Sequence, residues 1–136
     1  MATQVIVHVE RGKGNFYSAY IKDNPLPYGV IGDGYSVSEA IADFKKSYEE
    51  MKAHYLQNNE PFQEAEFSFQ YDVPSFLKYY QGILSLAGME RMTGISQQQL
   101  SQYLNGTRRP SPKTSMRIQD SIHTFGAELS QMSISL

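Results

Sequence analysis

Apolar and polar residues alternate at the start of the chain in the manner of a β-hairpin. Residues 4–10 alternate, and a glycine-bearing turn at residues 11–15 leads into a second β-rich run at residues 16–21. Three valines share one side of the first run: Val5, Val7 and Val9. A turn-rich connection at residues 23–27 and a short candidate strand at residues 28–32 come next. The pattern therefore predicts a hairpin followed by a third strand.

A long amphipathic helix is expected after the third strand. Ser36 and Glu39 have the spacing of a capping box, in which each side chain binds a backbone N–H at the helix start. Apolar residues then recur at every third or fourth position: Ala40, Ile41, Phe44, Tyr48, Met51 and Tyr55. Residues 58–61 end the helix, and residues 66–71 alternate again as a final strand. We therefore expect a β-β-β-α-β unit in which one helix covers one face of a sheet.

The chain beyond Pro74 shows only helical periodicity. Proline is accepted in the first turn of a helix but not inside one, so it marks a boundary. Helices are predicted at residues 75–84, 86–93, 96–104 and 112–125, with a short segment at 127–132. The last four residues fit a frayed tail or an edge strand. We predict an α+β protein with two domains, residues 1–73 and residues 74–136.

Composition narrows the class of protein. The chain has 136 residues, of which 40% are hydrophobic and 19% charged, as in folded soluble proteins. It has no cysteine, which excludes disulfides, thiolate zinc sites and a cysteine nucleophile. No apolar run is long enough to cross a bilayer, and the N-terminus is too short and polar for a signal peptide. We expect a cytoplasmic protein.

Charge is distributed unevenly along the chain. Residues 1–74 carry six Lys or Arg against eleven Asp or Glu, a balance of −5. Residues 75–136 carry six against three, a balance of +3. A basic half joined to an acidic half indicates two tasks, and the basic half is the candidate for contact with phosphate groups.

Residues 89–110 have the spacing of a helix-turn-helix. Gly94 permits the left-handed backbone that joins two helices at a steep angle. Ile95 fills the angle between them, and Ser96 with Gln99 forms a second capping box at the start of the next helix. That helix would be the recognition helix of a DNA-binding domain, whose N-terminal turn enters the major groove.

The predicted DNA contacts follow from this placement. A glutamine amide pairs in bidentate fashion with adenine N6 and N7, a helix N-terminus attracts phosphate, and arginines beyond the helix hold the DNA backbone. The predicted contact residues are Ser96, Gln97, Gln98, Ser101, Gln102, Arg108, Arg109 and Lys113, with Arg117 as an addition. The alternative interpretation is a helical hairpin whose glutamines are only solvated. The combined spacing favours DNA binding.

The segment from about Ser75 to Leu129 resembles the helix-turn-helix of Xre/Cro-type repressors. One departure is Glu90, where that family usually has a small residue such as alanine packed between the two helices. A carboxylate there leaves either a wider helix angle or a pair with Arg91 or a neighbour. Because one module of this size binds weakly, we expect a homodimer or higher oligomer on double-stranded operator DNA. The C-terminal helices and the N-terminal sheet both stay open as dimer interfaces.

The N-terminal half is similar to the HicB family of antitoxins. The residues that carry this resemblance are 17–21 and 32–40, with Ser36 where threonine is usual and Tyr35 in place of a small or polar residue. The proline-glycine-cysteine sequence that usually precedes this region in the family is kept only in part, at residues 26–29. The resemblance implies a partial RNase H-like fold that binds and neutralises a small, basic, mRNA-cleaving toxin of HicA type, in a complex that represses its own operon.

Two other functions compete with this one. A nuclease needs several inward-facing carboxylates that hold two metal ions. Here the pattern predicts Asp23, Asp33 and Glu39 in loops or a capping box, and it predicts no acid in mid-strand before Glu66. The three histidines are widely separated, so we expect no enzyme, no metal and no cofactor. The closer alternative is a stand-alone Xre-type regulator with an N-terminal ligand-binding or dimerisation domain.

Overall fold

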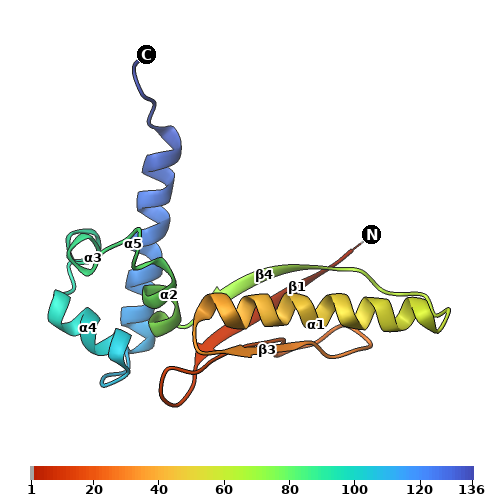
Figure 1. The fold of residues 1–136 in the computed structure, drawn as a ribbon. Coiled ribbons are helices and arrows are strands. Elements are labelled where there is room, and N and C mark those ends of the chain that lie inside the picture. Colours follow the sequence, from red (N-terminus) through yellow and green to blue (C-terminus); the bar gives the residue numbers. More distant parts are fainter. Residues whose placement is uncertain (1) are drawn as a thin grey trace. The chain divides into compact units, whose positions relative to one another are not determined.

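The computed structural model describes residues 2–136, which form two compact units that divide between Tyr79 and Tyr80 (Figure 1). The N-terminal unit holds a four-stranded sheet and a long helix, and the C-terminal unit is helical, so the expected α+β class is confirmed. The predicted domain boundary, between residues 73 and 74, falls in the first turn of α2 (Val73–Tyr80). The observed division between the two units lies near the C-terminal end of the same helix. No helix within residues 2–136 combines the length and apolar character that crossing a membrane requires.

The sheet has the strand order β3-β2-β1-β4. β1 pairs antiparallel with β2 and β2 with β3, whereas β1 and β4 run parallel. The elements are β1 (Thr3–Arg11), β2 (Tyr17–Tyr20), β3 (Ile31–Gly34), α1 (Val37–Gln57) and β4 (Ala65–Tyr71). Figure 1 shows α1 lying along one face of the sheet. The predicted order β-β-β-α-β is confirmed, and the single helix supplies the crossover that a parallel strand pair needs.

The third strand lies later than the sequence predicts. We expected it at residues 28–32, whereas β3 begins at Ile31. The side chain of Asn24 closes the preceding residues into a turn, since its Oδ1 accepts from the Leu26 N–H at 2.9 Å and its Nδ2 donates to the Tyr28 carbonyl at 2.8 Å. A backbone held in this way by a side chain cannot join a strand ladder at the same residues.

The core of the N-terminal unit lies between the sheet and α1. Its buried side chains include Val5, Val7, Val9, Tyr17, Ala19, Ala40, Ile41, Phe44 and Tyr48. An aromatic cluster extends this core, in which Tyr28 stacks on Phe62 with ring centroids 4.9 Å apart. The Tyr28 hydroxyl donates to the Gln63 carbonyl at 2.7 Å, and burial raises the pKa of Tyr28 to about 12. The apolar stripe predicted for the helix therefore packs as expected.

Polar side chains define both ends of α1. Ser36 Oγ accepts from the Glu39 N–H at 3.0 Å, and Glu39 Oε2 accepts from the Tyr35 N–H at 3.0 Å. In the predicted capping box, Glu39 would accept a second hydrogen bond from the Ser36 N–H. In the structure it accepts this bond from the Tyr35 N–H instead. At the other end Asn58 caps the helix, and its N–H donates to the His54 carbonyl at 3.2 Å.

β3 passes very close to α1 at Gly32. A Cβ at this position would lie 2.3 Å from the carbonyl oxygen of Ala40 and 2.3 Å from the backbone nitrogen of Phe44. Both atoms belong to the helix backbone, which cannot move aside as the end of a flexible side chain can. Only glycine lets the strand and the helix approach this closely.

The C-terminal unit contains α3 (Leu86–Thr93), α4 (Gln97–Asn105) and α5 (Pro112–Gln131). The first helix beyond Pro74 is predicted at residues 75–84, but α2 already ends at Tyr80. A turn follows, in which the Leu84 N–H donates to the Tyr80 carbonyl at 2.7 Å. Ser85, Ser96 and Ser111 are the N-caps of α3, α4 and α5. Each serine accepts from the N–H three residues later and so binds a donor that the helix leaves free.

α5 is one continuous helix where the sequence predicts two segments. We expected a break after Phe125, but the helix runs through Gly126 to Gln131. A glycine inside a helix costs only about 1 kcal/mol relative to alanine and does not by itself end it. Residues 132–136 form neither helix nor strand, so the edge-strand alternative for this tail is wrong.

We expect Gly32→Ala to destabilise the N-terminal unit by roughly 1–3 kcal/mol or more, because the added methyl group forces β3 and α1 apart. Urea unfolding followed by far-UV circular dichroism measures the loss. Gly29→Ala is the matched control, since a Cβ at Gly29 meets no atom within 4 Å. Equal unfolding midpoints for the two variants would contradict the close approach.

Candidate nucleic-acid interface

The turn between α3 and α4 is held by a left-handed glycine and a buried threonine. Gly94 has φ 76° and its N–H donates to the Glu90 carbonyl at 2.8 Å. Thr93 is buried, and its hydroxyl donates to the Met89 carbonyl at 2.7 Å while accepting from the Ile95 N–H at 3.1 Å. Gly94 was expected from the sequence, whereas Thr93 was not. A small polar residue directly before a turn glycine was the available signal.

α4 packs one face inward and leaves the other exposed. The buried apolar side chains of this unit are Met89, Ile95, Leu100, Tyr103 and Ile118. Leu100 and Tyr103 thus form the inner stripe of α4, and Leu104 beside them is half-buried. Gln97 and Gln98, on its first turn, are exposed, while Ser101 and Gln102 are half-buried. The first turn of α4 is thus free to meet another molecule.

The N-terminus of α4 is bound by two side chains. Ser96 Oγ accepts from the Gln99 N–H at 3.1 Å, which is the first half of the predicted capping box. The second half does not form, because the Gln99 amide donates to the Tyr103 hydroxyl instead. Glu90 Oε1 accepts from the Gln97 N–H at 2.7 Å and supplies the second acceptor.

Glu90 therefore has a role that the sequence alternatives did not specify. They offered a wider helix angle or a pair with Arg91 or a neighbour, and the structure places its carboxylate on the backbone of α4, seven residues away. A negative charge at the positive end of a helix stabilises that helix. It also occupies the N–H of Gln97, which would otherwise be available to a phosphate, and its charge repels phosphate. An anion near this end of α4 would therefore meet cationic side chains and not the Gln97 N–H.

The loop after α4 carries two exposed arginines, Arg108 and Arg109. Gly106 ends the helix in the left-handed conformation, with φ 77°. The Gln102 carbonyl then accepts from the N–H of Thr107 at 3.0 Å and from that of Arg108 at 3.3 Å. These bonds hold the start of the loop against α4, so the two arginines follow this helix at a defined position.

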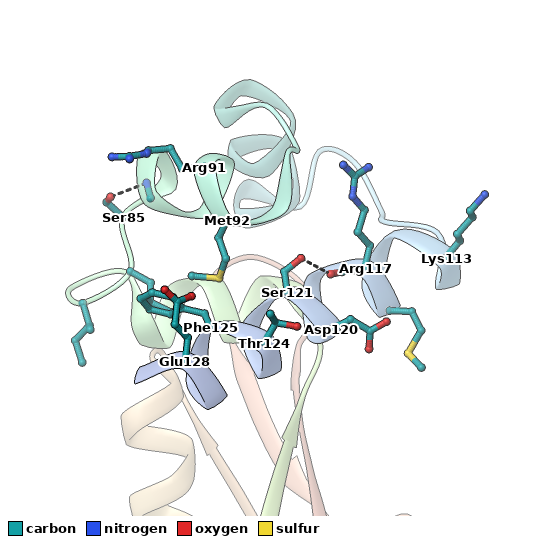
Figure 2. Close-up of a pocket in the computed structure, with 14 residues that line it drawn as sticks. Ser85, Arg91, Met92, Lys113, Arg117, Asp120, Ser121, Thr124, Phe125 and Glu128 are labelled. Atoms are coloured by element: carbon teal, nitrogen blue, oxygen red, sulfur yellow. Dashed lines mark hydrogen bonds between the residues drawn. The ribbon is translucent and has the colours of Figure 1, made fainter. Parts of the chain in front are cut away.

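Three further cations lie around a groove between α3 and α5. The groove has a volume of about 1100 Å³ and includes Arg91, Lys113 and Arg117 in its lining. Figure 2 shows Arg91 at the upper left and Arg117 with Lys113 at the right, with the carboxylates of Glu128 and Asp120 lower in the view. A terminal nitrogen of Arg117 lies only 2.7 Å from the position of a Cβ on Gly94, so its guanidinium rests against the turn. Arg91 was not among the predicted contacts.

Residues 81–121 match the helix-turn-helix family HTH_3, an Xre-type DNA-binding domain. The matched span covers α3, α4 and the first half of α5, together with the turn and the arginine loop. The chain matches no curated protein and no solved structure with statistical significance. The Xre-type resemblance is thereby confirmed for residues 81–121, and the domain supports a DNA-binding transcriptional regulator. The individual DNA contacts remain predictions.

We expect Glu90→Gln to raise affinity for DNA about two- to fivefold at low salt, because the amide keeps an acceptor for the Gln97 N–H but removes the charge that repels phosphate. The gain should shrink as salt is added, since screening weakens the repulsion. Fluorescence anisotropy with labelled duplex DNA measures it. Glu128→Gln, on α5, is the control, and an equal gain in both variants would assign the effect to net charge alone.

Proposed function

We propose that this protein is a transcriptional repressor that reads operator DNA through α4 and neutralises a small basic toxin of HicA type through its N-terminal unit. The observation that carries the DNA part is the exposed first turn of α4, which presents Gln97 and Gln98 on a helix capped by Ser96 and Glu90. Amide side chains at this end of a recognition helix lie where base edges are read.

Cationic side chains supply the affinity that does not depend on sequence. Arg108 and Arg109 follow α4 directly, and Arg117 rests against the turn that precedes it. Lys and Arg that neutralise phosphates release counterions, which makes binding strongly salt-dependent. The proposal thus assigns base readout to Gln97 and Gln98 and backbone contacts to the arginines.

The toxin part of the proposal is supported by the sheet face that α1 does not cover. Strand alternation and register direct one set of side chains to that face: Gln4, Ile6, His8, Glu10, Ser18, Tyr20, Ile31, Asp33, Glu66, Ser68 and Gln70. Three of them are carboxylates and none is Lys or Arg. Ile6 and Ile31 are 55% and 57% exposed. An acidic surface with exposed apolar side chains suits a basic protein partner.

This outer face is organised before any partner binds. His8 and Tyr20 stack with ring centroids 5.8 Å apart, and the register places Ile31 beside Tyr20. Ser18 donates to the Asp33 carboxylate at 2.8 Å. Side chains fixed in this way lose less entropy on binding. Together with the HicB-like residues at 32–40, the face favours a toxin over a small ligand, for which a concave pocket would be expected.

For the DNA part we expect two kinds of loss. Gln98→Ala should relax preference at one or two base pairs, at a cost of roughly 1–3 kcal/mol on the operator, because a bidentate contact is removed. Arg108→Ala should weaken binding to all sequences and flatten the salt dependence. Binding to randomised duplexes at several salt concentrations separates the two effects. Unchanged sequence preference in Gln97→Ala and Gln98→Ala alike would show that α4 does not read bases.

The toxin part predicts that a short basic protein is encoded next to this gene, and that co-expression of this chain restores growth which that protein alone arrests. Ile6→Lys should abolish the rescue, because it removes apolar contact and adds a charge of the partner's sign. Leu56→Lys is the control, since Leu56 is also highly exposed, at 61%, but lies on α1. If the unaltered chain failed to rescue growth, the toxin part of the proposal would be wrong and the protein would be a regulator whose N-terminal unit has another partner. The DNA part would not be affected.

A further inference from the structure

The apolar side chains of α5 and its C-cap follow a heptad spacing. They lie four, three, four and three residues apart: Ile118, Ile122, Phe125, Leu129 and Met132. This period places them along one face of the helix, and it is the pattern by which helices pair with one another. The stripe is therefore longer than packing within the C-terminal unit alone requires.

Burial decreases steadily along this stripe. Ile118 is only 3% exposed, whereas Leu129 is 50% and Met132 55% exposed. All residues from 126 to 136 are exposed. Figure 1 shows the last turns of α5 running beyond α3 and α4 of the same unit. The same face thus packs inside the unit at its start and lacks cover at its end.

Exposed apolar side chains gather in the last eight residues, which we name the C-terminal apolar segment: Leu129, Met132, Ile134 and Leu136. Contiguous exposed apolar surface of this kind marks an interaction site. The half-buried Ile122 and Phe125 lie at its border, so a partner that covered this segment would continue the same apolar face. Glu128 is the only charged residue from 126 to 136, so two copies meet little like-charge repulsion.

We propose that the C-terminal apolar segment pairs with the same segment of a second copy, so that two chains associate through the ends of their α5 helices. A two-fold pair needs one self-complementary surface, and this segment is uncharged and apolar on the face concerned. The proposal rests on the proposed function only for its consequence on DNA. Two linked recognition helices read two half-sites, and the linkage raises affinity without new contacts.

The test compares two methionines of equal exposure. Met116 and Met132 are both 55% exposed and both belong to α5 or its cap, but only Met132 lies on the stripe. Sedimentation equilibrium of the full chain should show a dimer for the unaltered protein and for Met116→Asp. Met132→Asp should raise the dimer dissociation constant roughly tenfold or more, because an aspartate would be buried between the copies. A monomeric unaltered chain, or equal behaviour of both variants, overturns the proposal.

Cross-linking gives a second measurement that does not depend on destabilising the dimer. The chain has no cysteine, so Leu129→Cys introduces a single thiol. Mild oxidation should link two copies of this variant and leave Met116→Cys unlinked. A dimer that persists but links equally through both thiols overturns the proposal by placing the contact elsewhere. A monomer that still selects its operator overturns this proposal alone, whereas a dimer without DNA affinity overturns the proposed function alone.

Discussion

The left-handed turn at Gly94 is the constraint on which the DNA-facing geometry depends. Thr93 binds the backbone on both sides of it from a buried position, and Glu90 binds the first turn of α4 across it. Every one of these bonds lies within the C-terminal unit. The direction of α4 is therefore set within this unit, and, if α4 reads DNA as proposed, ordering it adds little to the entropy cost of binding.

Periodicity and turn chemistry predicted the elements whose stability is local. The strand-helix-strand order of the first half follows from alternation and from the Ser36 cap, and the helix-turn-helix follows from Gly94 with the inner stripe at Leu100 and Tyr103. In each case the residue types that form the element also pack it. Local preference and tertiary packing agree, which is what makes an element readable from one sequence.

Features that depend on a hydrogen bond between a side chain and the backbone of another segment could not be predicted from the local sequence pattern. The third strand shifts because Asn24 binds the backbone of the residues before it. The Gly126 signal for a break is overridden by continuous helical bonding in α5. The Glu90 carboxylate reaches α4 only because the turn brings residues 90 and 97 together. Hydrophobic periodicity and residue spacing cannot predict a contact such as that between residues 90 and 97 until the angle of the turn between the two helices is known.

Under the proposed function, Glu90 also affects how the protein searches a genome. A chromosome offers about 10⁶–10⁹ competing sites, and electrostatic attraction to phosphate holds a repressor on all of them. Repulsion from the Glu90 carboxylate acts on every sequence alike, whereas Gln97 and Gln98 are proposed to discriminate only at the target. Under that proposal, the acid shortens each stop at a wrong site and leaves a larger fraction of the molecules unbound. In this proposal, a lower overall affinity for DNA is accompanied by a shorter search for the target sequence.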